Sequence, residues 1–310
     1  MSTPTGPRFS YGTNGLADHR LGDALRLLAD LGYEGVALTL DHQHLDPYAP
    51  GLAARLTEIR RTLDATGLAV VVETGARYLL DPRRKHRPTL LSAEPEGRAL
   101  RLDLLRRAVG IGAVLGAEAV HFWSGTPDAG TTREQAWQRL TDGCAETVAH
   151  AEAAGIDLAF EPEPGMLVAD LAGYRKLLAD LGRPERFRLT LDLGHCQCLE
   201  PHPVARCVEL AADRLAHVQI EDMRRGTHEH LPFGEGEIDF PPVLAALADT
   251  GYRGLVSVEL PRHSHAGAET ARHSIAFLRK AAAARRRPPA PPQPHPPHQP
   301  QASKKEAVPV

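Results

Sequence analysis

Four side chains of the metal-binding type follow one another along the second half of the chain. Glu161, Asp192, His217 and Glu259 are separated by 31, 25 and 42 residues, and each lies in or at the end of a short apolar run. Three carboxylates and one imidazole form a mostly oxygen donor set, which suits Mn²⁺, Mg²⁺ or Co²⁺ and also accepts Zn²⁺. A lone carboxylate after a strand often only caps the next helix, but four such residues together predict one divalent metal site.

The apolar runs that carry these residues belong to a pattern that recurs along the chain. In each repeat an amphipathic helical stretch ends near a Gly, and a short run rich in β-branched residues follows. The runs do not alternate with polar residues, which indicates strands buried on both faces of a parallel sheet. The expected strands span residues 8–12, 35–40, 68–73, 119–123, 157–161, 187–192, 215–220 and 254–259. The expected helices lie near residues 19–31, 51–66, 94–116, 131–154, 170–181, 202–213, 240–250 and 267–284.

Eight strand–helix units predict an α/β fold of the (β/α)8 TIM-barrel type over residues 1–280. A doubly wound open sheet is the main alternative, but no expected strand is followed by the G-x-G-x-x-G phosphate turn. In a TIM barrel the active site forms at the C-terminal ends of the strands. The four candidate ligands are therefore expected to meet at one point, although they lie far apart in the sequence.

Residues 281–310 differ in composition from the rest of the chain. They hold nine of the 26 prolines and a net charge of +4, which leaves −7 for residues 1–280. A segment made mostly of Pro, Gln and His cannot bury apolar area, so we expect a disordered tail rich in Pro, His and basic residues. A peptide ligand for a partner domain, or metal binding by His295 and His298, is the alternative function of this segment.

The overall composition is that of an ordinary globular protein, with 310 residues, 42% of them hydrophobic, and a net charge of −3. The chain has no run of about 18 apolar residues, so we expect no membrane-spanning helix. The first residues lack the basic and apolar regions of a signal peptide, and four cysteines do not form a disulfide scaffold. These features favour a cytoplasmic protein. The lack of a basic excess argues against a general nucleic-acid binder.

Five motifs in the second half of the chain carry a resemblance to a known superfamily. They are E-P-E-P-G from Glu161, L-D-x-G-H ending at His195, H-V-Q-x-x-D from His217, H-L-P-x-G-x-G-x-I-D-F from His230, and V-x-V-E ending at Glu259. Their order resembles that of the xylose isomerase-like TIM-barrel superfamily, most of all its sugar (or sugar phosphate) isomerase/epimerase branch. The resemblance covers about residues 9–280 and is strongest from Glu161 to Glu259.

The resemblance implies roles for individual residues. Glu161, Asp192, His217 and Glu259 match the metal ligands of that branch. His195 matches a His that lies behind the ligands or contacts the substrate. His230 matches a residue that reaches the substrate from the loop after the seventh strand. The chain departs from the family pattern at 162–164, where Pro-Glu-Pro replaces other polar residues.

The activity that the resemblance implies is that of a metal-dependent isomerase or epimerase. Such an enzyme moves a proton next to a carbonyl of a keto sugar, cyclitol or sugar phosphate, through an enediolate. The reaction needs a base, an acid and a group that stabilises the enediolate oxygen, which a divalent ion supplies. Glu161 and Glu259 come from strands that are three steps apart around the ring, so they are the expected acid/base pair.

Two further groups are expected at the same end of the barrel. His121 and Trp123 lie on one side of the fourth strand, and if that side faces inward they contact the substrate. Residues 77–87 include five Arg and Lys residues. Arg offers a bidentate fork to a phosphate or carboxylate, so Arg83 and Arg84 are the expected contacts of an anionic substrate. The alternatives are a structural His–Trp pair in the core and a solvated basic loop.

Other functions are compatible with the same barrel. A dehydratase or lyase would use the same metal-enediolate chemistry. A metal phosphodiesterase of the endonuclease IV type would use a His-rich site, but the third strand ends in Glu73 where that branch has a His. A non-catalytic binding protein is a third possibility, against which the intact Glu/Asp/His/Glu set argues. The expected partner is a small sugar or cyclitol, with homo-oligomers common on such barrels.

Overall fold

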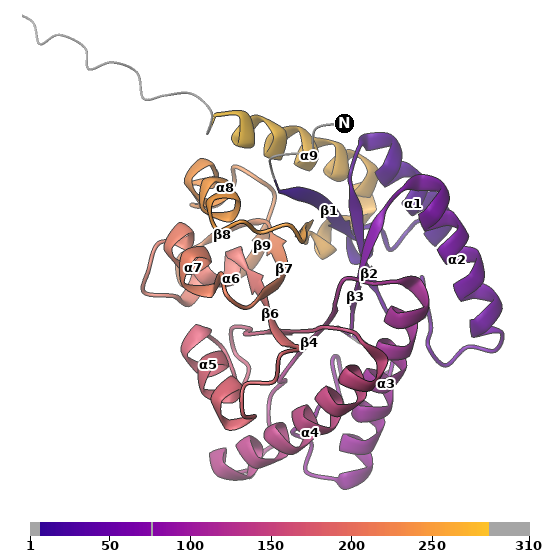
Figure 1. Cartoon of the computed structure of the whole chain (residues 1–310), viewed down its shortest axis with the longest axis vertical. Coiled ribbons are helices and arrows are strands. Elements are labelled where there is room, and N and C mark those ends of the chain that lie inside the picture. Colours follow the sequence, from indigo (N-terminus) through magenta and orange to yellow (C-terminus); the bar gives the residue numbers. More distant parts are fainter. Residues whose placement is uncertain (1–6, 76, 285–310) are drawn as a thin grey trace, which may run out of the picture.

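A closed barrel of parallel strands forms the centre of the molecule. The computed structural model describes residues 7–75 and 77–284. Within them, eight strands pair in the cyclic order β1-β10-β7-β6-β5-β4-β3-β2 (Figure 1). This confirms the predicted (β/α)8 barrel and excludes the open sheet. The barrel strands are β1 (Arg8–Gly12), β2 (Gly35–Thr39), β3 (Ala69–Glu73), β4 (Val120–Trp123), β5 (Leu158–Glu161), β6 (Phe187–Asp192), β7 (Leu215–Ile220) and β10 (Leu255–Val258).

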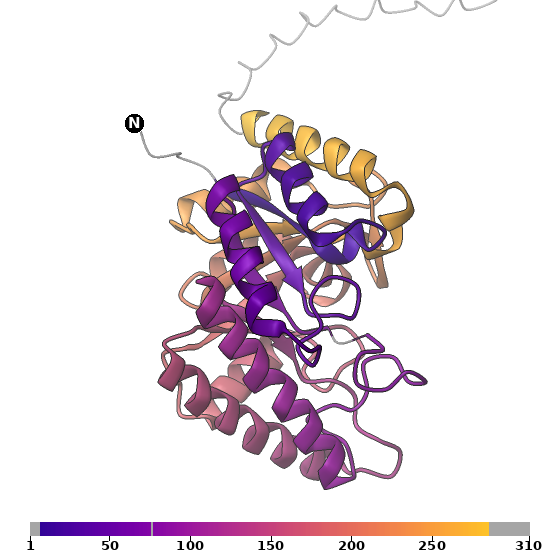
Figure 2. The ribbon, with the colours of Figure 1, turned by 90° about the vertical axis from the view of Figure 1, so that its right-hand side faces the viewer.

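Helices surround the barrel on the outside (Figure 1). In Figure 2, which turns the molecule by 90°, the indigo to magenta helices of the first half stand in front of the strands. Many of these helices end at a glycine, as the sequence indicates; Gly116, for example, has φ of +68° and ends α3 in the left-handed conformation. The helices are α1 (Leu21–Leu31), α2 (Leu52–Thr66), α3 (Pro95–Leu115), α4 (Arg133–Ala154), α5 (Leu171–Asp180), α6 (Leu193–Leu199), α7 (Val204–Ala211), α8 (Phe240–Asp249) and α9 (Gly267–Ala284).

The barrel strands are apolar on their outer side and largely polar on their inner side near the C-terminal ends. Outward residues such as Phe122, Phe160 and Phe187 pack edge-to-face or tilted, with ring centroids 5.2–6.2 Å apart. Tyr174 of α5 stacks on Phe187 at 5.9 Å. Inward residues include Ser10, whose Oγ lies 2.6 Å from Ser257 Oγ. Both sides are buried, which explains why the sequence shows no alternation of apolar and exposed residues.

Some elements of the structure were not predicted from the sequence. Helix α6 directly follows β6, because the Asp192 side chain accepts a hydrogen bond from the His195 N–H at 2.7 Å and caps the helix. After β7, the strands β8 (Asp222–Arg224) and β9 (Thr227–Leu231) form an antiparallel hairpin. Two short 3-10 helices follow β1 and β10, namely η1 (Thr13–Leu16) and η2 (Pro261–Ala266).

Helix α9 continues to Ala284, four residues beyond the predicted end of the barrel at 280. The remainder of the predicted tail, residues 285–310, lies outside the described residues.

None of the helices in the described part of the chain is long and apolar enough to cross a membrane.

Candidate active site

A cavity of about 630 Å³ opens at the C-terminal end of the barrel strands. Its walls come from the last residues of β3, β4, β5 and β7, from the residue after β10, and from the loops that follow the strands. The lining side chains are mostly polar and charged; they include Asn14, Glu73, Arg77, Lys85, His86, His121, Trp123, Glu161, Glu163, His195, Gln219, His228, His230, Glu259 and Arg262. The location is the one expected for the active site of a TIM barrel.

Of the four predicted metal ligands, His217 lies at a different depth from the others. It pairs with Thr190 on β6, whereas Asp192, two residues further along, pairs with Gln219. The Nε2 atom of His217 lies 2.8 Å from the Ser257 hydroxyl, and His217 is fully buried. In the described structure Gln219 lines the cavity, whereas His217 and Asp192 do not; Asp192 lines a small adjoining pocket with His195. Strand alternation places both on the inner side, so the more C-terminal one reaches the site.

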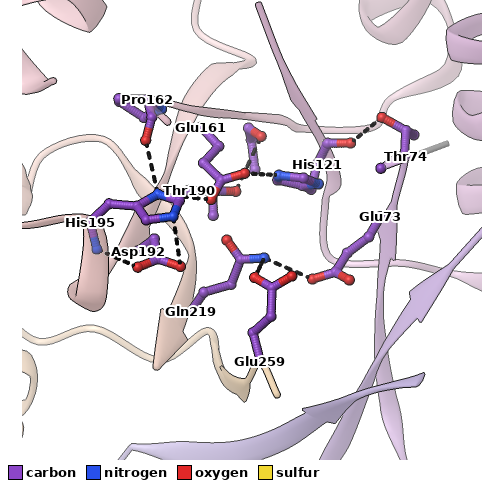
Figure 3. Close-up of polar contacts among 12 residues, drawn as sticks. Glu73, Thr74, His121, Glu161, Pro162, Thr190, Asp192, His195, Gln219 and Glu259 are labelled. Carbon is purple, nitrogen blue, oxygen red and sulfur yellow. Dashed lines mark hydrogen bonds and ion pairs between the residues drawn. The ribbon is translucent and has the colours of Figure 1, made fainter. Parts of the chain in front are cut away.

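Gln219 connects two carboxylates at the floor of the cavity (Figure 3). Its Nε2 donates to Glu259 Oε2 at 2.8 Å and to Glu73 Oε1 at 3.1 Å. Both amide hydrogens are therefore used, while the buried Gln219 Oε1 has no hydrogen-bond partner among the described residues. Asn14 donates to the other oxygen of Glu259 at 3.0 Å. The Gln219 carbonyl oxygen is thus free to accept a cation.

Glu161 is held against a histidine on the neighbouring strand (Figure 3). Its Oε2 lies 2.6 Å from His121 Nε2, and both side chains are almost fully buried. Burial raises the pKa of Glu161 well above its ordinary value, and the charges of Glu163 and Glu259 raise it further. Burial also raises the pKa of Glu259. The two carboxyl groups predicted to transfer protons therefore lie in one electrostatic environment that favours their neutral forms.

Asp192 and His195 are joined by the first turn of α6. One oxygen of Asp192 caps the helix, and the other, Oδ2, has no hydrogen-bond partner among the described residues. Burial would raise the pKa of Asp192, but the neighbouring His195 and His230 keep it below the ordinary value. His195 Nδ1 lies 3.3 Å from the Pro162 carbonyl oxygen. Burial lowers the pKa of His195 to about 4, so its ring is neutral near pH 7.

The β8–β9 hairpin brings His228 and His230 to the cavity wall. Asp222, at the start of β8, holds the loop that follows the hairpin by accepting hydrogen bonds from the Gly234 N–H at 2.8 Å and the Ile238 N–H at 3.1 Å. His230 Nδ1 lies 3.8 Å from Glu221 Oε1. Burial alone would lower the pKa of His230, but its contact with Glu221 raises the pKa to about 10.

The basic loop after β3 divides into two parts. Arg83 and Arg84, the predicted anion contacts, are exposed, because their backbone N–H groups donate to Asp81 and the Arg84 side chain pairs with the same carboxylate at 2.7 Å. In the described structure they do not line the cavity, whereas Arg77 and Lys85 do. The role of Arg83 and Arg84 as anion contacts stays a prediction, and Arg77 and Lys85 are the cations of this loop that line the cavity.

His121 and Trp123 both face the cavity, the inward orientation on which their expected role depended. Trp123 is fixed from two sides. The Arg101 guanidinium lies 4.2 Å from its ring centroid, and the His86 ring meets its edge at 5.5 Å. Arg101 is buried and donates to the Thr74 carbonyl oxygen at 3.0 Å. Trp123 is thus a rigid, flat part of the cavity wall.

The donor set fits a divalent metal ion. Asp192 Oδ2 and Gln219 Oε1 are buried oxygens without a hydrogen-bond partner in the described chain. Gln219 lines the cavity together with the carboxylates of Glu161 and Glu259. Ligand atoms of Glu161, Asp192 and His195 lie within 4.8 Å of one another. So many buried acids are stable together only if protons or cations balance their charge.

Sequence comparison then places the chain in a family. A family model described as xylose isomerase-like TIM barrel matches residues 25–281. The chain belongs to this family. One relative that is similar in sequence is the L-ribulose-5-phosphate 3-epimerase UlaE of Salmonella paratyphi C (strain RKS4594). The two sequences are 26% identical over 260 residues, which cover 84% of this chain and 86% of the relative.

Solved structures of two epimerases share the fold of this chain. An L-ribulose 3-epimerase aligns with a TM-score of 0.73 and 21% identity, over 90% of this chain and 96% of the other. The 3-keto-D-glucoside 4-epimerase YcjR of E. coli aligns with a TM-score of 0.71 and 18% identity, over 88% of this chain and 99% of the other. At such identities these structures support the fold of this xylose isomerase-like chain, and the site must be argued from its own residues.

Several residues of this xylose isomerase-like site were missed by the sequence reasoning. The sequence reasoning chose His217 as the ligand from β7 and overlooked Gln219, although the alternation of the strand indicates that both side chains face inward. Glu73 was considered only as one of several polar residues that could bind substrate hydroxyls, and Lys85 only as part of a charged loop. His228 was considered only as one histidine of the alternative His-rich phosphodiesterase site, and no strand was expected at 227–231.

Proposed function

We propose that this chain is a sugar epimerase that inverts a carbon next to a carbonyl, with Glu161 and Glu259 as the acid/base pair. The observation that carries the proposal is a pair of carboxyl groups that face one cavity: the buried Glu161 at the end of β5 and the partly buried Glu259 directly after β10. Curated relatives named as sugar 3-epimerases support the same reaction class.

The two carboxyl groups have separate supports, which suits separate roles. Glu161 is oriented by His121, and Glu259 is oriented by Asn14 and Gln219. In epimerisation one group removes the proton from one face of the carbon, which gives an enediolate, and the other returns a proton to the opposite face. Raised pKa values bring a carboxyl group closer to the working pH, which lets it act both as acid and as base.

Glu161, Gln219 and Glu259, which line the cavity, would hold a divalent ion together with Asp192, whose ligand oxygen lies within 4.8 Å of one of Glu161. Gln219 would contribute its carbonyl oxygen in the place expected for His217. Oxygen ligands of this kind suit Mn²⁺, Mg²⁺ or Co²⁺. Such an ion supplies Lewis acidity to the substrate carbonyl. His195 and His121 then orient the carboxylates, and Trp123 offers a flat apolar surface to the carbon skeleton of the sugar.

Exchange of the substrate proton with solvent tests the reaction type. In D₂O, the wild-type protein is expected to introduce one deuterium at the inverted carbon of a ketose or ketose phosphate, because the proton passes through a carboxyl group. NMR and mass spectrometry of the product measure this. A product lighter by one water would indicate a dehydratase, and turnover without any deuterium would contradict the two-carboxylate mechanism.

The cations at the cavity mouth indicate that the substrate carries an anionic group. Arg77 and Lys85 line the cavity on one side, and Arg262 lines it after β10. Replacing both Arg77 and Lys85 by Ala is expected to raise KM for a ketose phosphate by about tenfold or more, because each charge-assisted contact contributes roughly 1.5–3 kcal/mol. KM for the unphosphorylated ketose should change much less.

The matched control for this prediction is Arg83→Ala with Arg84→Ala. It removes two charges from the same loop, but these side chains lie outside the cavity lining. We expect its KM to equal that of the wild type for both sugars. If the control variant loses phosphate preference and the Arg77/Lys85 variant does not, the original assignment to Arg83 and Arg84 stands instead.

A further inference from the structure

Asp41, two residues beyond the end of β2, brings to the cavity wall a carboxylate that the proposed epimerisation does not use. The residue is 3% exposed and lines the cavity. Its Oδ1 accepts hydrogen bonds from the Gln43 N–H at 2.9 Å and the His44 N–H at 2.7 Å. Its Oδ2 is buried and has no hydrogen-bond partner among the described residues. One oxygen of this carboxylate thus fixes a turn, and the other is available to a ligand.

The loop that carries Asp41 is anchored by the fold and not by a ligand. An Asp side chain that accepts backbone N–H groups shortly after it in the chain is typical of a tight turn. The buried His44 continues this anchoring, because its Nε2 lies 3.1 Å from the His19 carbonyl oxygen and its own carbonyl oxygen accepts from Arg55 at 2.9 Å. The free oxygen of Asp41 is therefore held in place in advance, as in sites where a few fixed polar groups determine specificity.

The order of the strands places Asp41 across the barrel from the candidate metal ligands. In the cyclic order of the barrel, β2 and β6 are four strands apart in both directions, so their ends face each other across the ring. Asp192 ends β6, and Glu161 ends the neighbouring strand β5. A sugar whose carbonyl lies beside those residues would extend its remaining carbons toward the end of β2.

The chemistry of the free oxygen determines which group of a sugar it can bind. A carboxylate oxygen only accepts hydrogen bonds, so its partner must be a donor. Sugar hydroxyls are such donors, whereas an ionised phosphate or carboxylate of the substrate is not. An ammonium group is also a donor, but Arg77 and Lys85 line the same cavity from the loop after the neighbouring strand β3 and disfavour a cation. A neutral hydroxyl group is therefore the expected partner.

We propose that Asp41 Oδ2 recognises a hydroxyl group of the sugar beyond the inverted carbon, so that the enzyme selects substrates with a free hydroxyl at that position. This inference rests on the proposed function for the orientation of the sugar, and it adds a residue that determines specificity. A site built to hydrogen-bond a hydroxyl discriminates against an analogue that lacks it, because the buried acceptor then stays unpaired.

Asp41→Asn tests the proposal, because the turn fixes the orientation of the new amide. The Gln43 and His44 N–H groups require an oxygen at the Oδ1 position, so the amide NH₂ replaces Oδ2 and an acceptor becomes a donor. The fold should tolerate this change, since Asn is as common as Asp in such turns.

Isothermal titration calorimetry of the full-length protein in buffer with MnCl₂ measures the effect without an activity assay. The probes are L-ribulose, L-ribulose 5-phosphate and D-allulose and, for the sugar that binds best, each analogue that lacks one hydroxyl beyond C3. In the wild type, loss of one of these hydroxyls should raise Kd by about tenfold or more. Asp41→Asn should bind the complete sugar as weakly as the wild type binds that analogue, and loss of the same hydroxyl should then have no further effect.

Asp46→Asn is the matched control. Asp46 lies in the same loop and also fixes a turn, through the Tyr48 N–H at 2.8 Å, but it is not among the described residues that line the cavity. This variant should bind every probe like the wild type. If circular dichroism shows that Asp41→Asn is unfolded, Asp41→Ser replaces it, because Ser keeps one oxygen for the turn and lacks the second.

The proposal is overturned if the Asp41 variant keeps the wild-type discrimination among the analogues, or if it weakens the complete sugar and all analogues equally, which would indicate a structural role only. It is also overturned if Asp46→Asn behaves like the Asp41 variant, or if the wild type binds none of the three sugars. Failure of the proposed function gives a different result, in which the expected binding pattern is present but the wild type epimerises no sugar.

Discussion

Replacing Glu161 or Glu259 by Gln is expected to lower kcat for epimerisation by on the order of 10²-fold or more. The amide keeps the size of the side chain but can neither accept nor return the substrate proton. Glu161 is paired with His121 at 2.6 Å, and Glu259 accepts hydrogen bonds from Asn14 and Gln219, so both side chains are positioned by contacts that an amide can partly preserve. Steady-state kinetics with a ketose phosphate measures the effect.

The two variants can be distinguished by isotope exchange. The carboxylate that remains in each variant can still remove a proton from its own face of the carbon, so each variant should exchange deuterium into only one of the two epimers. Metal content must be measured in parallel, because Glu161 and Glu259 are also proposed ligands. If both variants keep kcat within a few-fold of the wild type with full metal content, another residue performs the proton transfer.

Removal of the divalent ion is expected to lower kcat by about 10³-fold, and added Mn²⁺ or Co²⁺ should restore it. Lewis-acid stabilisation contributes several kcal/mol, and each 1.36 kcal/mol corresponds to about tenfold in rate. Asp192→Asn and Gln219→Leu should weaken metal binding, because they remove or alter the two buried oxygens that have no hydrogen-bond partner among the described residues. Isothermal titration calorimetry measures the metal affinity of each variant independently of turnover.

His217→Asn is the control that separates the sequence-based ligand set from the structural one. His217 lies 2.8 Å from Ser257 Oγ, below the layer that contains Asp192 and Gln219. We therefore expect His217→Asn to lose stability but to keep the metal affinity of the wild type. Loss of metal binding in His217→Asn, together with normal binding in Gln219→Leu, would return the ligand role to His217.

The barrel could be predicted from the sequence because its strands are marked by local features. β1, β6 and β7 span the predicted residues, and the ends of the other barrel strands lie within one residue of their predicted limits. A strand that is buried on both faces needs an unbroken run of apolar residues, and the helices between the strands end at glycines. Each strand can therefore be located from its own residues and their immediate neighbours. The closing pair of β1 with β10 follows from the number of units.

Depth along a strand could not be predicted in the same way. His217 and Gln219 both point inward, and the sequence does not show which of the two reaches the cavity; the pairing of Gln219 with Asp192 decides it. The same limit applies to Arg83 and Arg84, whose direction depends on a turn formed around Asp81. The β8–β9 hairpin gave no strand signal, because β8 has only three residues and the residues of β9 are exposed or partly exposed.

The anchoring of the β8–β9 hairpin has a consequence for how such an enzyme can diversify. Asp222 holds the loop after the hairpin through backbone N–H groups, so this anchor does not use the side chains of β9. Substitutions at positions 227–231 can then change the cavity wall, while selection for correct folding acts on other residues. For directed evolution, a library restricted to these codons should retain a high fraction of folded clones while sampling new substrate preferences.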